Sequence, residues 1–237
     1  ELRALPRLST LRVHVFGELK LGPGMAAAPL RELDAPHLTV PLAGLAPAQA
    51  RALESVHLGQ HAGVSVAPHA RGLRRAELYN FLPDALRTGV YEHLAVVGIQ
   101  NRPCLAVPHA ASLEISSVSN MQQGLCLQCP ETRALSIDYF FNLRAVLAPP
   151  GGLARLQTLD LAECPELTVM AINELIQLCP QLRTLRLRNP STRATSGERH
   201  VFGLVLRHPQ LTELDIQWDP YRAVYLSTCL LYTSDAA

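Results

Sequence analysis

The chain has few aromatic residues, almost no net charge and no long apolar run. Phenylalanine, tryptophan and tyrosine make up 5% of its 237 residues, whereas the hydrophobic fraction is 48%. The core must therefore be built mainly from leucine, alanine and valine, which suits thin stacked layers. A formal net charge of +1 gives no reason to expect a nucleic-acid partner. No apolar run approaches the roughly 18 residues of a membrane-spanning helix, so no membrane association is expected.

Cysteines are too few and too scattered for a disulfide framework. There are six in the chain, without the dense, regular spacing of small disulfide-rich proteins. The first residues, ELRALPRL, show no signal-peptide pattern. Together these observations favour a reducing compartment, and we expect a cytoplasmic protein.

Motifs of catalysis and of cofactor binding are also missing. The sequence has no Gly-x-Ser-x-Gly elbow, no phosphate-binding glycine loop and no HExxH helix. Cys126 and Cys129 have the spacing of half a zinc site or of a redox pair, but no second pair follows nearby, so packing is the favoured interpretation. His57 and His61 are the closest histidines, and only His57 would point from a strand. We therefore predict no enzyme, and no catalytic, metal-binding or cofactor-binding residue.

The clearest positive feature is a repeat within residues 156–187. The pattern Leu-x-x-Leu-x-Leu occurs there twice, 26 residues apart, first at Leu156, Leu159 and Leu161 and then at Leu182, Leu185 and Leu187. Each copy alternates apolar and polar residues, as a half-buried strand does. Between the copies, apolar residues recur at the spacing of one helical face, at Ile172, Leu175, Ile176 and Cys179. A strand, a turn and a helix that repeat at this period predict a solenoid.

Cysteine and proline occupy fixed places in this repeat. Cys164 follows Leu161 by three positions, Leu167-Thr168 comes next, and Cys179-Pro180-Gln181-Leu182 closes the unit. These residues resemble the leucine-rich repeat family of the ribonuclease-inhibitor-like superfamily, in particular the cysteine-containing subtype of F-box proteins. The resemblance implies an α/β fold. It would be a leucine-rich repeat solenoid, or horseshoe, with a parallel concave sheet of about ten short strands and a convex side of mixed loops and helices.

Comparable strands can be placed along the whole chain. Their central positions are Leu11, Leu33, Val56, Ala76, Val97, Leu113, Leu135, Leu159, Leu185 and Leu214. Most steps between them fall within the roughly 20–29 residues of this repeat class. The step of 16 residues from Val97 to Leu113 is too short for a convex helix. Either a bare loop around Pro103 and Pro108 closes that repeat, or the strand is misplaced.

The return segments between strands differ along the chain. Prolines and glycines in the early repeats predict short or extended returns, with a turn or two of helix at 46–53. Helical returns fit the sequence better from about residue 119 onward, at 120–129, 141–147, 168–179 and 198–207.

Residues 1–228 are expected to form a single leucine-rich repeat solenoid that is truncated at both ends. A repeat strand around Leu11 already lies near the start, without the polar capping repeat that usually covers an end layer. Residues 229–237, CLLYTSDAA, resemble the translation of a transposon end sequence used to prepare sequencing libraries. We interpret them as a non-biological tail, with a natural tail as the alternative.

The concave face is the candidate binding surface, because outward side chains alternate with the buried leucines of each strand. The residues that directly follow the ten central positions form the middle column of this face. Five of these ten residues are acidic, and Gly98, after Val97, is the fifth in order. Solvated charge is the simple explanation. The functional one is a groove for a partner with basic and polar groups, with Tyr79 and Trp218 as aromatic anchors. The candidate binding residues are Arg12, Asp34, His57, Glu77, Tyr79, Gln100, Glu114, Asp138, Asp160, Arg186, Arg188, Asp215, Gln217 and Trp218.

We predict a scaffold for protein–protein interaction, a monomeric solenoid that binds a protein or peptide on its concave face. The resemblance implies a more specific form, the substrate-recognition repeats of an F-box-type ubiquitin ligase adaptor. The alternative is a sensor or regulatory array of a larger receptor or bacterial repeat protein, with no link to ubiquitin. A purely structural role is a third possibility. A neighbouring F-box, nucleotide-binding module or kinase would discriminate among them.

Overall fold

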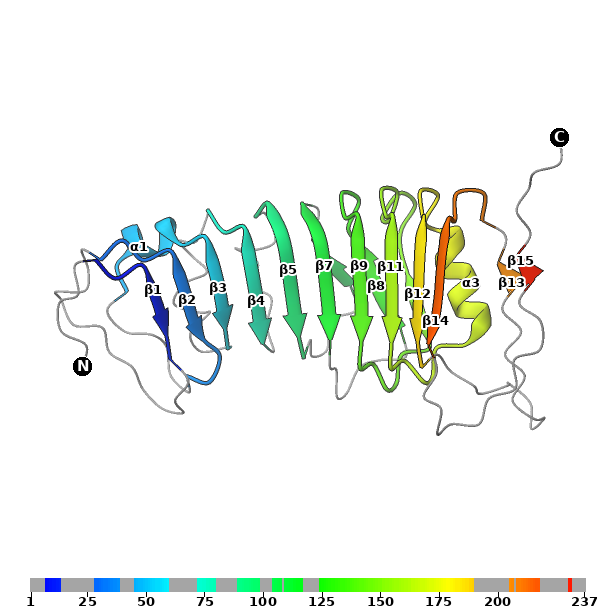
Figure 1. The fold of residues 1–237 in the computed structure, drawn as a ribbon, viewed down its shortest axis with the longest axis horizontal. Helices are drawn as coiled ribbons and strands as arrows, with labels where there is room; N and C mark the ends of the chain where they lie inside the picture. The colour runs from blue at the N-terminus through cyan, green and yellow to red at the C-terminus, as the bar shows by residue number, and fades with distance from the viewer. Residues whose placement is uncertain are drawn as a thin grey trace. The chain divides into compact units, whose positions relative to one another are not determined.

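The chain divides into two units, residues 1–99 and 100–237. A computed structural model describes residues 7–13, 28–38, 45–59, 72–79, 89–98, 104–107, 109–116, 124–189, 205–206, 208–217 and 230–231. Each unit is a run of parallel β-solenoid, in which successive strands lie side by side (Figure 1). None of the helices in the described ranges could span a lipid bilayer.

The first unit contains five parallel strands in sequence order. They are β1 (Thr10–Arg12), β2 (Glu32–Ala35), β3 (Ser55–Leu58), β4 (Arg75–Tyr79) and β5 (Tyr91–Val97). The register aligns one buried column, which consists of Leu11, Leu33, Val56, Ala76 and Leu94. A short helix, α1 (Pro47–Ala52), lies in the return segment where a turn or two of helix was predicted. Gln49 anchors it, since its side chain accepts from the Ala46 N–H and donates to the Ala28 carbonyl.

The fifth strand is displaced by three residues from the predicted register. Leu94, rather than Val97, pairs with Ala76, and Ala95 takes the place expected for Gly98. The prediction was wrong because Leu94, Ala95 and Val96 are all buried, so the run has no alternation that would identify its inward face. The steps on either side become 18 residues to Leu94 and 19 onward to Leu113, so the step of 16 is replaced by two steps just below the range of the repeat class.

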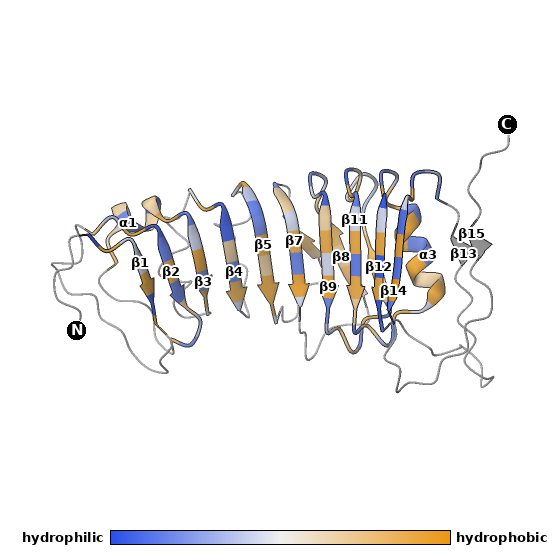
Figure 2. Cartoon of the chain, in the orientation of Figure 1, coloured by the Kyte–Doolittle hydropathy of each residue, from blue (hydrophilic) through white to orange (hydrophobic). Residues whose placement is uncertain are grey.

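The second unit also contains five parallel strands of the repeat. They are β7 (Ala110–Ser116), β9 (Ala134–Asp138), β11 (Thr158–Ala162), β12 (Thr184–Arg188) and β14 (Glu213–Gln217). The predicted register is confirmed here, with a central column of Leu113, Leu135, Leu159, Leu185 and Leu214. Apolar and polar residues alternate along these strands, as Figure 2 shows. This alternation gives β7, β9, β11 and β12 one buried and one polar face, whereas no residue of β14 is fully buried.

Most described return segments of the second unit are strands rather than helices. A smaller parallel sheet contains β6 (Cys104–Ala106), β8 (Gly124–Gln128) and β10 (Ala145–Leu147), in the order β10-β8-β6. The helices predicted at 120–129 and 141–147 are therefore wrong, as is the bare loop around Pro103. The reason is visible in β8, where buried Leu125 and Leu127 alternate with less buried neighbours at the strand period of two.

Two further return segments can be compared with the sequence. The helix predicted at 168–179 is confirmed as α3 (Val169–Gln177), and the Thr168 hydroxyl caps it by accepting from the Ala171 N–H at 3.2 Å. The helix predicted at 198–207 lies mostly outside the described residues, which include only strand β13 (Val205–Leu206) near its end. That strand pairs in parallel with β15 (Leu230–Leu231), within the segment interpreted as a tail.

Thr132 is a buried polar residue at a position where most other repeats carry leucine. Its side chain is fully buried, and its hydroxyl donates to the Ala110 carbonyl at 2.8 Å. Replacing Thr132 by valine keeps the shape but leaves that carbonyl without its donor, so we expect the free energy of unfolding to fall by roughly 1–3 kcal/mol. Urea denaturation measures the loss. Thr132→Ser retains the hydroxyl and is the matched control, so a larger loss in the serine variant would contradict the role of the hydrogen bond.

Candidate functional site

The polar face of each unit is the side of its strands opposite to the leucine column. In the first unit, Arg12, Asp34, His57 and Glu77 stand in adjacent register positions, as predicted. The His57 ring lies between two carboxylates, with Nδ1 2.9 Å from Asp34 Oδ1 and Nε2 3.6 Å from Glu77 Oε1. The Tyr79 hydroxyl donates to Glu77 at 2.9 Å, and its ring centroid is 5.2 Å from that of His57. These side chains contact one another, and Tyr79 is a member of the cluster.

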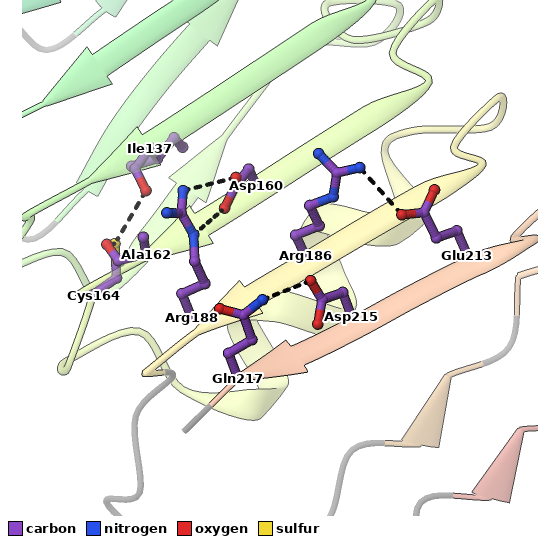
Figure 3. Close-up of polar contacts among 9 residues, drawn as sticks. All are labelled: Ile137, Asp160, Ala162, Cys164, Arg186, Arg188, Glu213, Asp215 and Gln217. Atoms are coloured by element: carbon purple, nitrogen blue, oxygen red, sulfur yellow. Dashed lines mark hydrogen bonds and ion pairs between the residues drawn. The ribbon is translucent and has the colours of Figure 1, made fainter. Parts of the chain in front are cut away.

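Carboxylates and guanidinium groups pair across strands on the polar face of the second unit. Arg188 donates from Nε to Asp160 Oδ1 at 3.2 Å and from Nη2 to Oδ2 at 2.8 Å (Figure 3). Arg186 donates to Glu213 at 3.1 Å, and Gln217 donates to Asp215 at 2.9 Å. The predicted acidic residues are thus present on this face, but arginines neutralise two of the carboxylates.

A pocket of about 370 Å³ lies at the carboxyl ends of the second unit's strands. Its lining residues are Asp138, Tyr139, Ala162, Glu163, Arg188, Asn189 and Gln217. Three of them were predicted as binding residues, namely Asp138, Arg188 and Gln217. The pocket therefore brings together side chains that are up to 79 residues apart in the sequence.

Tyr139, Glu163 and Asn189 form a second set of pocket residues that the sequence did not reveal. Each directly follows a strand, and each has a positive φ, of 57°, 48° and 47° respectively. Their backbone N–H groups donate to carbonyls of the next strand at 3.2, 3.0 and 2.8 Å, so the ladder continues one residue past β9, β11 and β12. This left-handed conformation is uncommon for tyrosine and glutamate, and such positions cluster at functional sites. Asn189 also donates from its side chain to Glu163.

Asp138 is the pocket residue whose carboxylate has an oxygen without a hydrogen-bond partner among the described residues. This oxygen, Oδ1, is buried. Burial raises the pKa of this carboxyl above its usual value. The positive charge of Arg188 and a hydrogen bond from the Tyr139 backbone oppose this rise, whereas the negative charges of Asp160 and Glu114 increase it. Arg188 acts on Asp138 through its charge and not through a hydrogen bond, because its donors go to Asp160, whose hydrogen bond raises the pKa of the guanidinium. The ionised form of Asp138 is therefore less stable than that of a fully solvated carboxylate, and a cation in the pocket would offset this difference.

The remaining predicted residues have mixed outcomes. Glu114, Asp160, Arg186 and Asp215 lie in the middle column of the second unit, as expected. Gln100 and Trp218 lie outside the described residues. Gln100 was expected to stand beside Tyr79, but Val97 is the register partner of Tyr79.

Three cysteines behave as buried packing groups, as the sequence indicated. Cys129, Cys164 and Cys179 are almost fully buried, and burial raises the pKa of each thiol to about 12. The Cys164 thiol donates to the carbonyls of Ala162 and Ile137 (Figure 3). Within the described ranges, no group of three or more histidines, cysteines or carboxylates is placed to hold a metal ion.

Comparison with known proteins gives no relative. No protein-family model, no curated protein and no solved structure matches the chain. The geometry of the polar faces and of the pocket is therefore the ground on which a function can be assigned.

Proposed function

We propose that the chain is a protein-binding scaffold and that the pocket of the second unit receives a basic side chain of its partner. One observation carries this proposal: Asp138 lines the pocket, and its buried Oδ1 has no hydrogen-bond partner among the described residues. A carboxylate in this position gains most from a cationic donor, because hydrogen bonds between charged groups are about twice as strong as neutral ones.

The chemistry around Asp138 favours lysine or arginine over an anionic or purely apolar group. Glu163 adds a second carboxylate to the lining, while the one lining guanidinium, that of Arg188, is already paired with Asp160. Tyr139 is 51% exposed at the same pocket and offers an aromatic face to a cation. The pocket thus combines negative charge, an aromatic ring and an existing framework of ladder hydrogen bonds.

The first unit offers a weaker case for a partner. Its polar face carries similar residue types, but His57 is held between Asp34 and Glu77, and Tyr79 is bonded to Glu77. A partner would have to break these contacts before gaining its own. For this reason we assign the binding role to the second unit.

The binding proposal can be tested with a phage-displayed library of random peptides selected against the full chain. We expect the selected peptides to contain lysine or arginine, and replacement of that residue by glutamine to weaken binding at least about tenfold. Fluorescence anisotropy of labelled peptides measures the affinity. Asp34→Asn, in the first unit, is the control variant and should bind as the wild type does. Selected peptides without a basic residue, or peptides that lose affinity for Asp34→Asn, would contradict the assignment.

A more specific form of the proposal is substrate recognition within an F-box-type ubiquitin ligase adaptor. It is supported only by the resemblance of residues 156–187 to the cysteine-containing leucine-rich repeat. Sequencing the full-length transcript or the genomic locus tests it. An F-box encoded ahead of Glu1, with further repeats of this subtype in place of residues 229–237, would support the adaptor role. A nucleotide-binding module or a kinase would favour the sensor or regulatory array instead.

A further inference from the structure

Three cysteines of the second unit converge beside the small return-side sheet. Cys104 of β6 and Cys126 of β8 are register partners, and Cys129 directly follows β8. The sulfur atoms of Cys104 and Cys126 lie 2.8 Å apart. Both side chains are partly exposed, whereas Cys129 is fully buried. The structure therefore places the thiols of two neighbouring strands in direct contact.

The register of β6 and β8 suits a covalent link. Neighbouring strands are about 4.7–4.9 Å apart, which lies within the about 4.4–6.8 Å that separates the Cα atoms of disulfide-bonded cysteines. The two sulfurs need to approach by less than about 1 Å to reach the bond length of about 2.05 Å. No large backbone movement is required.

We propose that Cys104 and Cys126 are a disulfide-forming pair that links two return segments of the second unit, and that Cys129 remains a thiol. With a small disulfide such as oxidised glutathione, the thiolate of one cysteine attacks an oxidant sulfur and releases one glutathione thiolate. The second cysteine thiolate then attacks the protein sulfur of the mixed disulfide and releases the other glutathione. Two protein thiols are oxidised, one glutathione disulfide is reduced to two thiols, and the two cysteine protons pass to these products.

Cys129 is unsuited to the same reaction. It is inaccessible to a reagent, its thiol lies 3.9 Å from the Leu105 carbonyl, and burial raises its pKa to about 12. Because the thiolate is the reactive species, Cys129 should react far more slowly than its partly exposed neighbours.

The test maps disulfides in the full chain after incubation with oxidised glutathione. Free thiols are alkylated, and the protein is cleaved after glutamate, at Glu92, Glu114 and Glu131. Cys104 then lies in fragment 93–114, while Cys126 and Cys129 both lie in fragment 115–131. Mass spectrometry should find the two fragments joined, with one alkylated cysteine in the second, and reduction should separate them. A disulfide confined to fragment 115–131, or three alkylated cysteines, would overturn the proposal.

Two variants identify which sulfur forms the link. Cys126→Ala should abolish the joined fragments, and Cys129→Ala should retain them. The opposite pattern would assign the bond to Cys129 and would refute the proposed pair. The melting temperature provides a readout that does not depend on the digest. Oxidation should raise it in the wild type and in Cys129→Ala, because the link constrains the unfolded chain, but it should have no effect in Cys126→Ala.

Discussion

Replacing Leu159 by alanine is expected to lower the free energy of unfolding by roughly 2–5 kcal/mol. Leu159 is fully buried and stands in register between Leu135 and Leu185. Its truncation removes apolar contacts and leaves a cavity that the flanking strands can fill only in part. Because a solenoid is stabilised mainly by contacts between neighbouring repeats, one substitution in the central column weakens two interfaces at once.

Ser136 provides the matched control for Leu159. It lies on the neighbouring strand β9, beside Asp160, but on the polar face and only partly buried. Ser136→Ala should change the free energy of unfolding by no more than about 0.5 kcal/mol. Urea denaturation of the two variants measures the contrast. Equal losses would mean that the inward and outward faces of these strands are assigned incorrectly.

Most of the repeat strands were predictable because a slip of one residue would exchange their buried and exposed faces. A leucine, valine or alanine at each central position and a polar residue beside it fix the register. The exception was β5, whose inward face is obscured by the consecutive apolar residues Leu94, Ala95 and Val96. Return segments such as β8 were missed for a related reason. Short apolar runs of this length fit a helix or a strand equally well from sequence alone.

The residues of the polar face were predictable, but their pairing was not. Asp160 stands directly opposite Arg186 in the register, yet it accepts both hydrogen bonds from the diagonal neighbour Arg188. Arg186 in turn reaches the diagonal Glu213 rather than Asp215. Long side chains reach diagonal partners as readily as direct ones, so the choice depends on rotamers that the sequence does not reveal.

The pocket could not be predicted from the sequence, because its lining depends on the backbone conformation one residue beyond each strand. Of its three residues with positive φ, only Asn189 is of a type that often adopts this conformation, and Tyr139 and Glu163 carry no such signal. A search for outward-pointing residues ends at the last strand position. It therefore finds Asp138 and Arg188 but not the residues that complete the lining.

Replacing Asp138 by asparagine is expected to stabilise the fold at neutral pH. Burial raises the pKa of this carboxyl in the folded state, so the folded protein binds its proton more tightly than the unfolded chain does. The stability that Asp138 contributes is fully present below the ordinary carboxyl pKa and is lost as pH rises through the raised folded value. Asparagine has no such dependence. Melting temperatures measured against pH should show the variant above the wild type at neutral pH, and the gap should close as pH falls.

The same substitution should weaken the binding of basic peptides while it stabilises the fold. Loss of a partly buried carboxylate leaves the peptide cation unpaired, and removing one member of such a pair typically costs about 2–5 kcal/mol of binding free energy, or roughly 30-fold or more in affinity. Wild-type affinity should rise with pH as Asp138 ionises, whereas the affinity of Asp138→Asn should be nearly independent of pH in that range. Asp215→Asn changes a carboxylate outside the pocket lining and serves as the control. If Asp138→Asn is more stable but binds basic peptides as the wild type does, the buried carboxylate does not contribute to peptide binding. In that case the partner must engage another part of the polar face.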